Sequence, residues 1–138
     1  MLTAIIFILL VGLLLAFAIN SLTTSVKRTT DIYTIEQAQI LAKSGTEYAI
    51  LAAQGHNFTS GCLQHININY QNTYDINITI HYIGKGFPAG CGPYILSNSL
   101  QTKDSNGTAI IDTVVSLKPS LQTDETHISY ARRTIQKL

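Results

Sequence analysis

Histidine, aspartate, cysteine and asparagine are the residues of this 138-residue chain whose side chains could carry out chemistry. The four histidines are His56, His65, His81 and His127. None has the tight spacing to a second ligand that zinc sites show, so we expect exposed histidines on strands and no metal. Asp75 and Asp112 have no evident partner, and no Ser/His/Asp order or carboxylate pair points to catalysis. The sequence therefore predicts no enzyme and no cofactor.

Cys62 and Cys91 are the only cysteines, and both follow the apolar N-terminal segment. Two cysteines in a small domain beyond a membrane segment favour a disulfide in an oxidising compartment. Two free buried thiols are the alternative. Closing a loop of this length would contribute on the order of 3–4 kcal/mol in the chain-entropy model. That is a large share of the stability of so small a core.

Three Asn-x-Thr tripeptides fit the acceptor sequence for N-linked glycans. They begin at Asn57, Asn77 and Asn106. Asn77 and Asn106 also have an aspartate two residues upstream, as in the extended acceptor motif of bacterial N-oligosaccharyltransferases. The alternative is plain polar surface, because Asn and Thr are frequent in this chain. We take all three as candidate glycosylation sites, with Asn77 and Asn106 ahead of Asn57.

The composition limits the choice of partner. Charged residues make up 12% of the chain and the net charge is +1. A nucleic-acid-binding domain shows a basic patch or stripe, so no direct contact with nucleic acid is predicted. The length fits a single domain.

Residues 1–19 are apolar on every side, with Thr3 the only polar side chain. A helix needs about 20 apolar residues to cross a hydrocarbon core of about 30 Å, so this segment can span a membrane. The apolar run begins at Met1 without a basic flank. Either Met1 is a translation start, or the sequence is a mature product that was cut just before the apolar segment.

We expect one helix over residues 2–54, since no proline interrupts it. Residues 20–30 are rich in hydroxyl and β-branched side chains, and we expect a weakly helical joint there. From residue 31 small and apolar residues recur at steps of three and four, and this face should pack closely against a sheet or another helix. Its members are Ile32, Ile35, Ala38, Ala42, Gly45, Ala49 and Ala52/Ala53. Glu36, Gln39, Lys43 and Glu47 are predicted to form a solvated flank.

The remainder alternates polar and apolar residues, which is typical of strands. A hairpin is predicted over 65–83, with Ile66, Ile68, Tyr70, Ile76, Ile78 and Ile80 facing inward. Residues 94–98 suggest a short strand, and 109–117 and 126–136 two longer ones. The prediction is an α+β fold in which the long helix packs on an antiparallel meander of about four strands. Residues 1–30 form the anchor and joint, and residues 31–138 form the head, with the half-helix 31–54 and the sheet within 62–138.

With these features the chain resembles the type IV pilins and pilin-like proteins (pseudopilins), mostly through residues 1–55. The resemblance implies a pilin fold, removal of a leader, and N-methylation of the new N-terminus at Met1. It also implies storage in the inner membrane, then extraction by pilus assembly machinery into an extracellular helical homopolymer. The core of that polymer would hold Ile5, Ile6, Phe7, Leu9, Leu10, Leu13, Leu14 and Phe17. The heads would form a surface for adhesion, motility or uptake.

Three features depart from the family pattern. The family usually carries a glutamate at the fifth mature position, where this chain has Ile5, and no acid precedes Asp31. Only Gly12, without a proline, could loosen the apolar helix. The cysteine pair would enclose the first hairpin instead of a C-terminal loop.

Three functional hypotheses follow. The first is a major pilus subunit. The second is a minor or tip subunit of a pilus or type II secretion system, because such subunits can lack the acid. The third is a membrane-anchored binding domain that never polymerises. Such an anchor has no need of small residues along 38–53, and it would leave Lys27 and Arg28 on the external side, against the positive-inside tendency.

Overall fold

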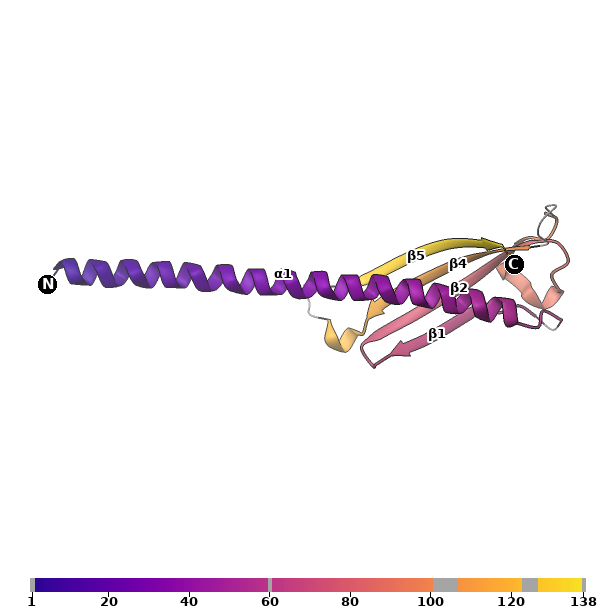
Figure 1. The fold of residues 1–138 in the computed structure, drawn as a ribbon, viewed down its shortest axis with the longest axis horizontal. Helices are drawn as coiled ribbons and strands as arrows, with labels where there is room; N and C mark the ends of the chain where they lie inside the picture. Colours follow the sequence, from indigo (N-terminus) through magenta and orange to yellow (C-terminus); the bar gives the residue numbers. More distant parts are fainter. Residues whose placement is uncertain (1, 60, 101–106, 123–126, 138) are drawn as a thin grey trace. The chain divides into compact units, whose positions relative to one another are not determined.

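The computed structural model describes residues 2–59, 61–100, 107–122 and 127–137. It divides into two compact units, Met1–Thr34 and Ile35–Leu138. The first unit is helical, and the second, called the head below, combines the last part of the same helix with all the strands. The predicted α+β fold is confirmed (Figure 1).

Helix α1 spans Leu2–Gly55, and it continues through residues 20–30, which were predicted to be weakly helical. Threonine hydroxyls in this segment donate hydrogen bonds to carbonyls four residues earlier, for example Thr24 to Asn20 at 3.0 Å and Thr29 to Ser25 at 3.0 Å. Such bonds satisfy the hydroxyl inside the helix instead of letting it compete for backbone groups in another conformation. They explain how a threonine-rich stretch is accommodated in α1.

The head half of α1 buries a row of small residues against the sheet. Ala38, Ala42, Gly45, Ala49 and Ala53 are all buried. A Cβ atom added to Gly45 would lie 3.1 Å from Cγ2 of Ile76, so the helix backbone and the sheet approach closely at that point. The prediction of a small-residue face is confirmed for this row.

Ile32 and Ile35 do not belong to that row, contrary to the prediction; they are 62% and 41% exposed. Stepping back from Ala38 by four and then three residues leads to Thr34 and Asp31, which are half-buried. Ile32 and Ile35 each lie one residue further along, and at 3.6 residues per turn that is a rotation of about 100°. The face toward the sheet therefore continues through Thr34 and Asp31, and Ile32 and Ile35 lie beside it.

The strands form one sheet in the order β1-β2-β4-β5, all antiparallel. They are β1 His65–Tyr70, β2 Tyr74–Gly84, β4 Gly107–Leu117 and β5 Ser129–Lys137. The short β3, Ile95–Ser97, pairs in parallel with β2 at Tyr82 and Ile83, beyond the stretch of β2 that pairs with β1. Two 3-10 helices, Ala89–Tyr94 and Pro119–Leu121, lie in the connections. The predicted four-strand meander is confirmed, and the short strand predicted at 94–98 is present as β3.

The hairpin turn between β1 and β2 follows from its residues. Gln71 and Asn72 both have positive φ, at 49° and 59°, as the two central residues of the tight hairpin turn require. Thr73 N–H donates to the Tyr70 carbonyl at 2.9 Å. Asn69 Oδ1 accepts a hydrogen bond from Asn72 N–H at 3.0 Å. This turn sets the register in which Ile66 lies opposite Ile78.

The core lies between the sheet and the head half of α1. Its strand residues are Tyr74, Ile76, Ile78, Ile80, Tyr82, Ala109, Ile111 and Val115. Ile66 and Ile68 of the edge strand are half-buried. Tyr70, which was also predicted to face inward, is 41% exposed, so only part of its side chain is buried. Two buried threonines satisfy each other, because Thr46 Oγ1 and Thr113 Oγ1 lie 3.0 Å apart and Thr46 also donates to the Ala42 carbonyl at 2.7 Å.

Candidate functional site

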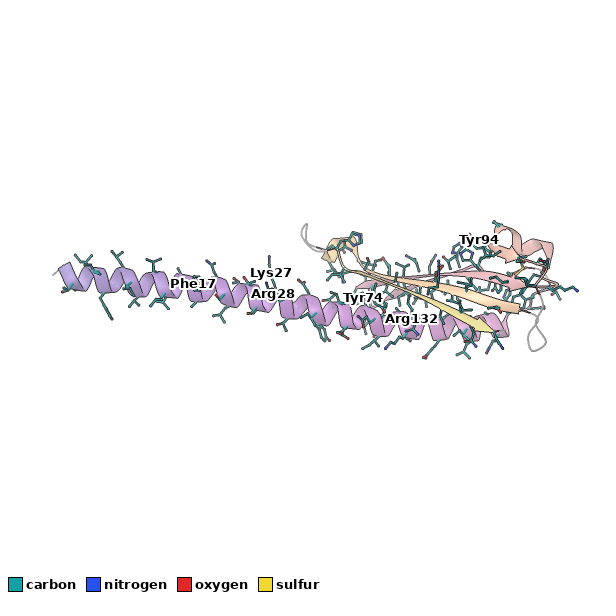
Figure 2. All side chains as sticks on the ribbon, turned by 90° about the horizontal axis from the view of Figure 1, so that it is seen from above. Phe17, Lys27, Arg28, Tyr74, Tyr94 and Arg132 are labelled. Carbon is teal, nitrogen blue, oxygen red and sulfur yellow. A yellow bond between two sulfur atoms is a disulfide. The ribbon has the colours of Figure 1, made fainter. Side chains whose placement is uncertain are left out.

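The first unit exposes its large apolar side chains around the whole helix. The eight residues expected to form a polymer core are all between 53% and 74% exposed. They are Ile5, Ile6, Phe7, Leu9, Leu10, Leu13, Leu14 and Phe17, and Figure 2 shows the side chains standing out around α1. Burial of apolar surface contributes about 25 cal/mol per Å², so this surface is stable only against lipid or protein. Met1, the predicted methylated residue, lies outside the described residues.

By length and composition α1 can cross a membrane. Its most apolar 18-residue window has a mean hydropathy of 2.8, and none of that window is buried by the rest of the chain. The coarse prediction of an N-terminal segment able to anchor in a membrane is thus met.

The head half of α1 carries a second apolar row, which the sequence interpretation missed. Ile40 and Leu51 are 63% and 69% exposed, and Tyr48 beside them is 55% exposed. Ile40 is nine residues from Ala49, and Leu51 nine from Ala42, which is about two and a half turns at 3.6 residues per turn. Ile40 and Leu51 therefore lie on the side of α1 away from the buried alanines, and Tyr48 lies about 60–80° around the helix from them. These three exposed residues are called the outer row below. The spacing of these three large residues was the available signal.

The small residues along 38–53 do not distinguish a filament subunit from an anchored binding domain, contrary to the sequence interpretation. Ala38–Ala53 were read as unnecessary for an anchored binding domain, yet these residues pack on the chain's own sheet. They are needed to fold the head whatever its function. The outer row, in contrast, stays exposed on the same half of α1 and can contact other molecules. Glu36, Lys43 and Glu47 beside it are exposed, as predicted, and Gln39 is half-buried.

The disulfide between Cys62 and Cys91 is present, with the two Cα atoms 4.8 Å apart. Cys91 is fully buried, and the bond joins the segment before β1 to the 3-10 helix after β2. It therefore encloses the first hairpin, as predicted.

Two histidines hold the end of this disulfide-linked segment on the face of the sheet opposite α1. The Tyr94 hydroxyl lies 2.6 Å from His65 Nε2, and the His81 ring stacks on Tyr94 with ring centres 5.6 Å apart. His65 Nδ1 also lies 3.3 Å from the Thr79 hydroxyl. His65 is exposed and His81 is half-buried, and their contacts with Tyr94 hold this segment against the sheet. Within the part of the chain that the structure describes, no three His, Cys, Asp or Glu residues are grouped as metal ligands.

Asp112 has a partner, contrary to the sequence interpretation. It lies opposite Arg133 of β5, whose Nε and Nη2 donate to its two carboxylate oxygens at 2.6 and 2.8 Å. These hydrogen bonds hold the pKa of Asp112 below its usual value. Asp75 likewise accepts a hydrogen bond from Asn69 Nδ2 at 3.1 Å.

Burial raises the pKa of the Tyr82 hydroxyl to about 12, and this hydroxyl donates to the Leu63 carbonyl at 2.7 Å.

The candidate glycosylation sites fall in different surroundings. Asn57 is exposed in the turn after α1, and Asn77 is exposed in the middle of β2. Asn106 lies outside the described residues.

Comparisons of this chain with family models, with curated proteins and with solved structures gave no match. The functional argument therefore depends on the chain's own features.

Proposed function

We propose that this chain is the structural subunit of an extracellular, type IV pilus-like helical filament. The subunit is held in the inner membrane by its apolar helix before assembly. In the filament the same helix packs against copies of itself, and the heads form the outer surface. Processing and N-methylation at Met1, and delivery by pilus assembly machinery, belong to the same proposal.

The observation that carries the proposal is the outer row of the head. A membrane anchor accounts for exposed apolar residues up to Ile19, but it does not account for Ile40, Tyr48 and Leu51 on the half of α1 that packs on the sheet. Ile40 and Leu51 lie on one face about three turns apart, with Tyr48 on its flank, and large exposed side chains at such spacing are available for packing against a second helix. A helical polymer gives both exposed surfaces a partner of the same kind.

The test compares two substitutions on the head half of α1. Ile40→Glu places a charge in the outer row, whereas Lys43→Glu places the same side chain on the exposed flank. Both positions are exposed, so the head should keep its thermal stability in both variants. Filaments sheared from cells that make only the variant chain should be lost or shortened with Ile40→Glu and retained with Lys43→Glu. Normal filaments with Ile40→Glu would contradict the proposal.

Ile5 supports a second candidate, the minor or tip subunit of a pilus or type II secretion system. An acid at this position would offer a charge partner to a neighbour's N-terminal amine, and an isoleucine cannot. A subunit at the tip of the filament has fewer neighbours to register against. The amount of this chain in sheared filaments separates the two, since a major subunit is abundant and a tip subunit is present in traces.

A further inference from the structure

Asn57 stands in an exposed turn with its amide fixed by the third residue of its own tripeptide. The Thr59 hydroxyl donates a hydrogen bond to Asn57 Oδ1 at 2.7 Å, and Thr59 N–H donates to the same oxygen at 3.1 Å. Because the amide group is planar, a carbonyl oxygen held toward Thr59 leaves Nδ2 on the side away from it. The nitrogen that would carry a glycan therefore lies on the side away from Thr59, in an exposed side chain.

Asn77 has the aspartate of the extended acceptor motif, which Asn57 lacks, but its backbone is less accessible to a transferase. It lies inside β2, opposite Asn67 of β1 on one side and Val114 of β4 on the other. An enzyme that draws the acceptor segment into its own active site would have to break both ladders, and a buried backbone group left unpaired is costly. Among the described residues 56–59 around Asn57, none belongs to a strand. Accessibility of the backbone thus reverses the order expected from sequence.

A cavity lies beside Asn57, with a volume of about 570 Å³. Asn57, Phe58, Phe87, Pro88 and Lys85 are among its lining residues. The two lining rings, Phe58 and Phe87, are in edge-on contact with centres 6.1 Å apart, and Phe58 also packs on the buried Tyr82 with centres 5.7 Å apart. Small-ligand pockets have volumes of about 300–1,000 Å³ and are mainly apolar with a few polar groups. A pyranose ring fits this chemistry, with C–H groups toward the rings and hydroxyls toward the Lys85 ammonium.

We propose that Asn57 is N-glycosylated and that its first sugar lies in this cavity. In the transfer, Nδ2 of Asn57 forms a bond to the anomeric carbon of a lipid-pyrophosphate-linked saccharide. The bond from that carbon to the phosphate oxygen breaks, the pyrophosphate leaves with the electron pair, and one amide proton passes to the transferase. The modification requires only that the head face the compartment of the transferase, and it does not depend on filament assembly.

The test uses the full-length chain in detergent, an N-oligosaccharyltransferase that needs only Asn-x-Ser/Thr, and a lipid-pyrophosphate-linked oligosaccharide of known mass. Peptide mass spectrometry should find the glycan mass on the peptide that contains Asn57 and not on the one that contains Asn77. Thr59→Ala should remove the modification and Thr59→Ser should retain it. The same peptide from cells that make the protein naturally should also carry a glycan. A bare Asn57 in either preparation, or modification of Asn77 in the folded chain, overturns the proposal.

The place of the sugar is tested separately by thermal unfolding. The glycan should raise the melting temperature of the head, and Phe87→Ala should reduce that increase. The comparison is made between glycosylated and bare forms of each variant, so any loss of packing from Phe87→Ala cancels. An increase that is equal in both variants overturns the cavity assignment. Filaments formed normally by Asn57→Gln would leave the proposed function intact whatever the outcome at Asn57.

Discussion

The two halves of α1 use large and small residues in opposite ways. Up to Thr34 the large apolar side chains surround the helix and are exposed, and the chain buries none of the most apolar window. From Ile35 onward the fully buried helix residues are alanines, with Gly45 and Thr46 also buried, while Ile40, Tyr48 and Leu51 remain exposed. The closest contacts of this helix with the sheet are thus made by its smallest side chains, with the partly buried Leu41 and Ile50 packed at the sides. The most exposed large side chains of both halves remain available for other molecules.

The largest effect is expected from a charged residue placed in the apolar first half of α1. Leu14→Asp should abolish filament assembly, because an unpaired charge buried in an apolar bundle costs at least several kcal/mol in every subunit. Thr24→Asp, in the hydroxyl-rich segment of the same unit, is the matched control and should be tolerated better. Electron microscopy of sheared material provides the measurement. Unchanged filaments with Leu14→Asp would show that the apolar segment is not the polymer core.

A second test acts on the head alone. Replacing both Cys62 and Cys91 with serine should lower the free energy of unfolding of the head by about 3–4 kcal/mol, the value of the closed loop in the chain-entropy model. Urea denaturation followed by circular dichroism measures this loss. The helical signal of the first unit should persist at urea concentrations that unfold the variant head. An unchanged midpoint would mean that the bond contributes nothing to the stability of the head.

The smallest expected effect is at Asp112 and Arg133. The folded-state pKa of Asp112 is lowered, so its contribution to stability is complete above the unfolded-state value of about 4 and is lost as the pH falls through the folded-state value. The urea midpoint of the wild-type head should therefore fall more between pH 6 and pH 3 than that of Asp112→Asn. The difference should be slight, because Arg133 is exposed and solvent screens the pair. Equal pH dependence in both proteins would remove the pair from the stability of the head.

The periodicity of apolar residues within each element was sufficient to predict the helix, the hairpin and the inward face of β2. Alternation over 76–80 predicted the buried Ile76, Ile78 and Ile80, and small residues at steps of three and four predicted the face that meets them. Each of these signals is contained within one element. Asp112 was assigned no partner because Arg133 reaches it only through the register of β4 with β5, and no local pattern defines that register.

The candidate site was less predictable for a similar reason. The exposed apolar residues of the first half follow from composition. The outer row could be recognised only once the alanine row was assigned to the sheet. Asn57 and Asn77 carry comparable tripeptides, and what separates them is pairing of the backbone on both sides of Asn77. Tyr94 gave no signal, since its contacts with His65 and His81 depend on how the disulfide-linked segment folds back.

The cysteine bond also has a mechanical consequence. Tension that enters the head from α1 reaches β1 just after Cys62, and the bond carries that tension directly to Cys91. The 29-residue separation spanned by the bond cannot be pulled straight while it is intact. At about 3.4 Å per extended residue, the bond reduces the length that the head can gain on unfolding by roughly 100 Å. In the proposed filament, a head that unfolds under load would therefore lengthen less with the bond intact than with the bond reduced.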